Sequence, residues 1–117
     1  MTTKEKGTLL HELFPDETVR FIGYVEQAAK MVKDNPIQIR GGWKPKKMSA
    51  AGWAQIATDI LEKIKGHREA LEKDSKEFTR VLFEGYFSLF LKQCLQDYMK
   101  ICPDFSFKLC IEAFFKL

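Results

Sequence analysis

A long apolar segment occupies the second half of the chain, between Lys76 and Cys102. As a helix it would carry apolar side chains over well over half of its circumference, and such a helix is normally surrounded by neighbouring elements. Pro103 and Asp104 mark its end, because proline cannot continue a helix. The rest of the chain must therefore cover this segment. Its apolar positions are Phe78, Val81, Leu82, Phe83, Phe87, Leu89, Phe90, Leu91, Cys94, Leu95, Tyr98, Met99 and Ile101.

Three earlier segments also carry helical signals. Pro15 is followed by two acidic residues, a favourable helix start, and apolar residues then recur in one stripe as far as Val32. Ser49 is a suitable N-cap for another helix, which carries Trp53 and further apolar residues at helical spacing. The segment Thr8–Phe14 predicts a short helix that ends there, because the residue before a proline disfavours the α conformation.

Two regions need a further argument. An uninterrupted helix from residue 50 to 102 would be about 80 Å long at 1.5 Å per residue, too long for one compact domain, so we expect a turn near residues 74–75. Residues 105–112 alternate between apolar and polar side chains, as a strand does. We nevertheless predict a helix over 109–117, because a lone strand would leave its backbone groups unpaired. For the same reason we interpret Ile37–Arg40 as an extended loop.

These patterns together predict an all-α fold, a compact bundle of about four main helices with additional short helical pieces. The chain has 117 residues, of which 45% are hydrophobic and 30% are charged, as is ordinary for a globular domain. A domain of this size buries roughly two-thirds of its unfolded surface, which is enough for a core without disulfides or metal. We expect a single helical domain over residues 1–117, with a basic connector at 40–48.

The cysteines bear on the cellular compartment. Cys94, Cys102 and Cys110 are odd in number and spaced eight apart, which fits neither a paired disulfide framework nor a Cys-x-x-Cys zinc site. We expect them to be reduced core residues. The N-terminal residues lack the continuous apolar region of a secretory signal, and no segment reaches the roughly 18 apolar residues of a membrane helix. The expected location is the cytoplasm, with no membrane partner.

No motif in the sequence indicates an enzyme. Neither His11 nor His67 belongs to a His-Glu-x-x-His motif, and Gly-x-Ser-x-Gly, phosphate-loop and dinucleotide motifs are absent. Cysteines surrounded by leucine and phenylalanine are expected to have raised pKa values, which makes them poor nucleophiles. We therefore predict a non-enzymatic protein with no catalytic residues, no metal ligands and no cofactor.

The segment 40–48 supplies the whole net charge of +3, because it holds four cations and no anion while the remaining segments are nearly balanced. Arg40, Lys44, Lys46 and Lys47 could neutralise phosphates while Trp43 stacks on a base, which would make nucleic acid the alternative partner. In the other interpretation the segment is a solvated connector, and Trp43 folds back to cover one end of the bundle. We favour the connector, since the flanking helices add no basic stripe.

The C-terminal region is unusually aromatic. Ten of the fifteen aromatic residues lie within positions 78–117, and the last four are Phe105, Phe107, Phe114 and Phe115. A small helical domain has limited interior, so part of this apolar surface is available to a partner. The function that we predict is therefore protein interaction or regulation, with self-association into a homodimer through the aromatic C-terminal helices.

Overall fold

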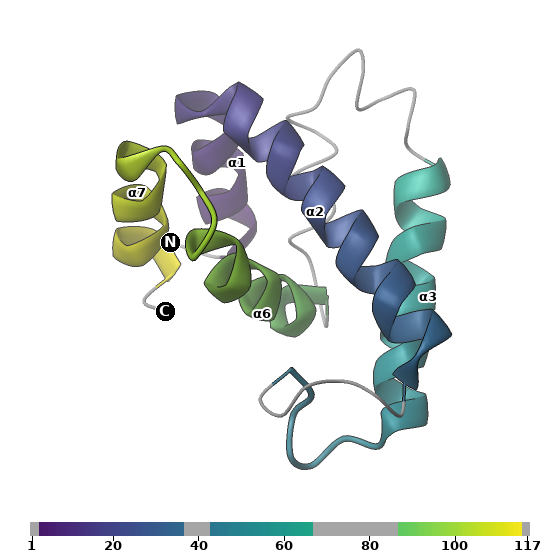
Figure 1. The fold of residues 1–117 in the computed structure, drawn as a ribbon. Coiled ribbons are helices and arrows are strands. Elements are labelled where there is room, and N and C mark those ends of the chain that lie inside the picture. Colours follow the sequence, from purple (N-terminus) through teal and green to yellow (C-terminus); the bar gives the residue numbers. More distant parts are fainter. Residues whose placement is uncertain (1–2, 37–42, 67–86, 116–117) are drawn as a thin grey trace.

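Five α-helices follow one another along the residues that the computed structural model describes, which are 3–36, 43–66 and 87–115. Among these residues there is no strand, which confirms the predicted all-α class, and five helices stand where about four were expected. The turn predicted near residues 74–75 and the loop predicted at Ile37–Arg40 lie outside the described residues. The helices are α1 (Thr3–Leu13), α2 (Pro15–Asp34), α3 (Ala50–Gly66), α6 (Phe87–Met99) and α7 (Phe105–Phe115) (Figure 1).

The junction between α1 and α2 is fixed by Pro15. Phe14 adopts a non-helical conformation with φ −137° and ψ 67°, since the α conformation is disfavoured before proline. Helical hydrogen bonds nevertheless continue on both sides, from the Phe14 N–H to the Leu10 carbonyl and from the Thr18 N–H to the Phe14 carbonyl. The predicted start at Thr8 was too late, because α1 begins at Thr3. The additional turn consists largely of Lys and Glu, which favour helices but add no apolar periodicity.

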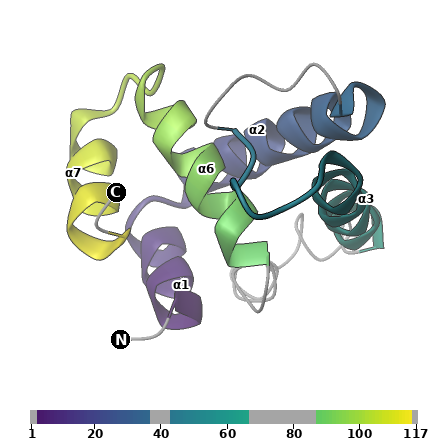
Figure 2. The ribbon, with the colours of Figure 1, turned by 90° about the horizontal axis from the view of Figure 1, so that it is seen from below.

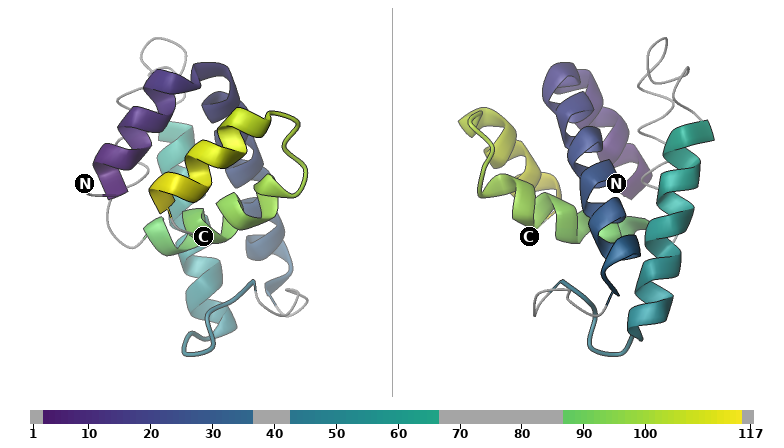
Figure 3. Two further views of the ribbon diagram at one scale, coloured as in Figure 1. Left: turned by 90° about the vertical axis from the view of Figure 1, so that its left-hand side faces the viewer. Right: turned by 45° about the vertical axis from the view of Figure 1, so that its right-hand side comes forward.

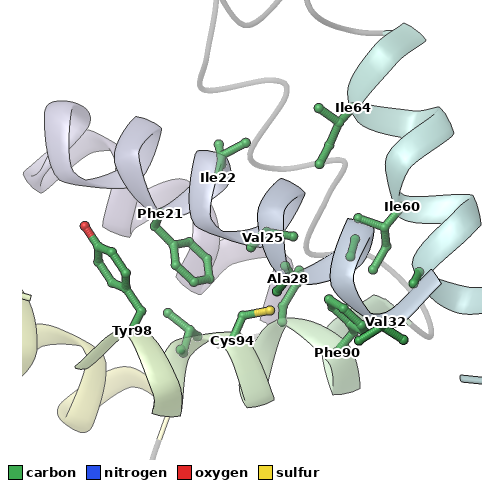
Figure 4. Packing of buried hydrophobic residues seen from close by; sticks show 14 of the residues in the cluster. Phe21, Ile22, Val25, Ala28, Val32, Ile60, Ile64, Phe90, Cys94 and Tyr98 are labelled. Carbon is green, nitrogen blue, oxygen red and sulfur yellow. The ribbon is translucent and has the colours of Figure 1, made fainter. Parts of the chain in front are cut away.

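The main pairing in the fold is between α2 and α3. The apolar stripe predicted for α2 is buried, and the facing side of α3 contributes Trp53, Ala57, Ile60 and Ile64. Figure 4 shows Ile22, Val25 and Val32 pointing toward the same interior as Ile60 and Ile64. The predicted N-cap is confirmed, because the Ser49 Oγ accepts the Gly52 N–H at 3.0 Å.

Helix α6 packs against α2, α3 and α7, as its apolar content demanded. The described part of the predicted helix begins at Phe87, and α6 ends at Met99, slightly before the predicted end at Cys102. The helix ends in a tighter turn of the 3₁₀ type, because the Ile101 N–H donates to the Tyr98 carbonyl, three residues earlier. One side of α6 is buried, whereas Leu89 on the opposite side is exposed.

Helix α7 confirms the prediction of a helical tail and corrects its start, which lies at Phe105 rather than Leu109. The period-two alternation of this segment is therefore not that of a strand. The Asp104 carboxylate accepts the Phe107 N–H at 3.0 Å and so caps the helix. Aspartate directly after Pro103 was the sequence signal for this start.

The helices are arranged so that α7 lies on the opposite side of the molecule from α3, with α2 and α6 between them (Figures 1 and 2). Seen from the α7 side, α7 is the foremost element and crosses over α6 (Figure 3). The radius of gyration is 13.6 Å, close to the value of about 13.4 Å for a compact domain of this length. One face of α7 is thus at the periphery of a compact bundle.

Candidate interaction surface

Most of the described aromatic residues of the C-terminal region belong to the core. The Phe90 ring packs against Trp53 with a centroid distance of 4.9 Å, and the Phe107 ring packs edge-on against Phe14 at 5.6 Å. Phe107 is fully buried and Phe114 is partly buried against the core. The side chain of Phe115 lies outside the described residues. Of the four phenylalanines predicted for an interface, Phe107 is therefore buried in the core of its own chain.

Phe105 is the exception, because its side chain is 71% exposed. Leu109 follows it by four residues on the same face of α7 and is 49% exposed, while Ile101, in the turn that leads into α7, is 64% exposed. We call these three residues the C-terminal patch. Ile101 and Leu109 were not among the residues predicted for the interface. Helical periodicity was the sequence signal that could have identified Leu109. Phe107 and Ile111 lie on the face of α7 toward the core, and Phe105 and Leu109 lie on the opposite face.

The charged residues beside the patch on α7 are Lys108, which is half-buried, and Glu112, which is exposed. They are four residues apart, with the lysine first, which is the less favourable order for a pair within one helix. No ion pair joins them to each other or to another described residue. Both charges thus remain available at the edge of the patch.

A buried polar cluster holds the start of α2 against the end of α6. The Glu17 side chain accepts hydrogen bonds from the Tyr98 hydroxyl at 3.1 Å and from the Cys102 thiol at 3.7 Å. The Arg20 guanidinium pairs with the other carboxylate oxygen at 2.5 Å. A buried carboxylate is tolerated only when it is satisfied in this way. The cluster fixes the turn that carries Ile101.

The three cysteines are free thiols, with Cys94 and Cys102 buried and Cys110 half-buried. Burial raises the pKa of Cys94, and the negative charge of Asp97 adds to this effect. Burial is also the main cause that raises the pKa of Cys102 and of Cys110. The thiols are therefore protonated near neutral pH, which agrees with the expectation that they are poor nucleophiles.

The basic connector is anchored to the bundle by Trp43. Its side chain is only 4% exposed, and its ring lies edge-on to Phe90 with a centroid distance of 5.9 Å. The Lys44 ammonium donates to the Met48 carbonyl at 2.5 Å, whereas Lys46 and Lys47 are exposed. Arg40 lies outside the described residues. The indole thus belongs to the core, as the connector interpretation expects, and its burial leaves little of its ring for a base to stack on.

Within the described ranges, no cluster of three potential metal ligands occurs, and no helix there is long and apolar enough to span a membrane. No protein-family model, curated protein or solved structure matches the chain.

Proposed function

We propose that this chain is a non-enzymatic interaction domain that self-associates through the C-terminal patch. The observation that carries the proposal is the 71% exposure of Phe105, with Ile101 and Leu109 also exposed nearby in the sequence. Phenylalanine is among the residues enriched in protein interfaces, and contiguous exposed apolar surface is a sign of association. Phe107, one of the residues expected at the interface, is buried in the core, and Phe114 is partly buried against the core.

The charges beside the patch favour a second copy of the chain as the partner. In an antiparallel two-fold pairing of α7 centred near Cys110, Lys108 of one copy lies opposite Glu112 of the other, and the same pair repeats by symmetry. Neither residue has an ion-pair partner within its own chain among the described residues. Such a pairing would bring Leu109 of the two copies together between two complementary charge pairs.

Sedimentation and light scattering over a concentration series test this proposal. The mass should rise from 13.6 kDa toward twice that value. Leu109→Gln removes roughly 1.5 kcal/mol or more of apolar burial from each copy, so the dimer should weaken by about 100-fold. Leu89→Gln is the matched control, since Leu89 is similarly exposed at 44% but lies on α6. The control should leave the mass curve unchanged.

A charge exchange tests the orientation of the pairing. Lys108→Glu should weaken association, and the double variant Lys108→Glu, Glu112→Lys should restore it, because the opposite charges again face each other. A constant monomer mass up to millimolar concentration would refute self-association. Equal effects of Leu109→Gln and Leu89→Gln would refute the C-terminal patch as its site.

A further inference from the structure

The buried carboxylate of Glu17 holds the segment between α6 and α7 at two points. Glu17 lies in the first turn of α2 and is only 7% exposed. One of its oxygens accepts hydrogen bonds from the Tyr98 hydroxyl, in the last turn of α6, and from the Cys102 thiol, beyond the end of that helix. Figure 4 shows the Tyr98 hydroxyl pointing toward the start of α2. Ile101 lies between these two anchored residues in the chain.

The start of α7 is tied to the same segment. The Cys102 Sγ also lies 3.7 Å from the Asp104 carbonyl oxygen, so its single hydrogen can go to that oxygen or to Glu17. The same carbonyl accepts the Lys108 N–H at 3.2 Å, and the Asp104 carboxylate accepts the Phe107 N–H at 3.0 Å. The contact of Cys102 with Glu17 therefore helps to set where α7 begins, and with it the part of the C-terminal patch that α7 carries.

The chemistry at this position favours a carboxylate. A carboxylate has about four lone-pair sites, so Glu17 can accept from the hydroxyl, the thiol and the Arg20 guanidinium together. The positive end of the α2 dipole also favours a negative charge in the first turn. A side chain without an acceptor oxygen would remove this hydrogen bond from the buried Tyr98 hydroxyl, and a buried donor that loses its acceptor is costly.

We propose that Glu17 is a positioning residue for the C-terminal patch, acting from the interior of its own chain. This inference rests on the self-association proposed above. Glu17 holds the segment that carries Ile101 and leads into α7 in one conformation, so the patch is ordered before a second copy binds. Association is stronger when the binding surface is ordered in advance, because less conformational entropy is lost on binding. In a two-fold dimer both copies gain from this effect.

Glu17→Ala tests the proposal, with Asp16→Ala as the matched control. Asp16 is the neighbouring acid in the first turn of α2, it is exposed, and its loss changes the net charge by the same amount. The dissociation constant of the dimer, measured by sedimentation over a concentration series, should rise at least about tenfold in Glu17→Ala. It should change by less than about threefold in Asp16→Ala. Glu17→Gln keeps an acceptor oxygen and should restore most of the affinity.

Backbone hydrogen exchange in dilute protein tests the same role in the monomer. The Ile101 and Cys102 N–H groups donate to the Tyr98 carbonyl at 3.0 and 2.9 Å. In Glu17→Ala these two groups should exchange at least about fivefold faster, whereas the N–H groups of α3 should change less. If Glu17→Ala does not fold, Tyr98→Phe removes one of the two donors and should produce the same two effects to a smaller degree.

The outcomes separate this role from the self-association itself. Unchanged exchange at Ile101 and Cys102, or equal dimer affinities of Glu17→Ala and Asp16→Ala, would overturn the role of Glu17 while the original protein still associates. A constant monomer mass of the original protein would refute the proposed function, and the role of Glu17 in association with it.

Discussion

Truncating Trp43 measures how firmly the connector is attached to the bundle. Burying a tryptophan side chain removes roughly 200 Å² of surface from water. At about 25 cal/mol per Å², this burial stabilises the fold by about 5 kcal/mol as an upper bound. A compact denatured state already buries part of this area, which lowers the value to about 3–4 kcal/mol. No described residue accepts a hydrogen bond from the buried Trp43 N–H, so removing this group offsets about 1 kcal/mol of the loss. We expect Trp43→Ala to cost about 2–3 kcal/mol.

Urea unfolding followed by helical circular dichroism gives this value directly. With a denaturant dependence of about 1–3 kcal/mol per molar urea, the midpoint should fall by roughly 0.7–3 M. Trp43→Phe is the matched control, because it keeps a ring against Phe90 and removes the buried indole N–H. It should remain within about 1 kcal/mol of the original protein.

A Trp43→Ala variant within about 0.5 kcal/mol of the original protein would refute the anchoring role. The nucleic-acid alternative also predicts that Trp43→Ala leaves the stability nearly unchanged, and it makes a second prediction about binding. The original protein would bind oligonucleotides with a log-log salt slope of roughly −2 to −4, and Trp43→Ala would weaken that binding. We expect no such binding at physiological salt.

Two further predictions concern the Tyr98 hydroxyl and the three cysteine thiols. Tyr98→Phe removes the hydroxyl that donates to Glu17 and should cost about 1–2 kcal/mol at neutral pH. Burial, reinforced by Glu17, raises the pKa of Tyr98 from 10.0 to about 12. The protonated hydroxyl therefore stabilises the folded state fully below pH 10, and this stabilisation is lost as the pH rises toward 12, because the unfolded chain loses the proton first. Urea unfolding across this window should show a shallower loss for Tyr98→Phe, and an unchanged slope would contradict the assignment. Alkylation followed by mass spectrometry should label half-buried Cys110 first and Cys94 last, and rapid labelling of all three thiols without denaturant would show that they are not core residues.

Local physical chemistry made several elements predictable from the sequence. Pro15 and the apolar stripe define α2, and the Ser49 cap defines the start of α3. Such signals lie within a few neighbouring residues, so no knowledge of the fold is required to interpret them. The start of α1 was not predicted correctly, because a turn of charged residues has helix propensity but shows no apolar periodicity.

The candidate sites depended on the tertiary structure. The sequence indicated an excess of C-terminal aromatic residues, but not that Phe107 turns inward while Phe105 turns out, since both are phenylalanines two residues apart. Likewise, the composition around Trp43 is compatible with a solvated loop, and only its packing against Phe90 makes the indole part of the core. A pocket between α2, α6 and the connector is lined by Tyr24, Trp43 and Asp97, which are distant along the chain. Contacts between such residues leave no local pattern, because chain folding alone brings them together.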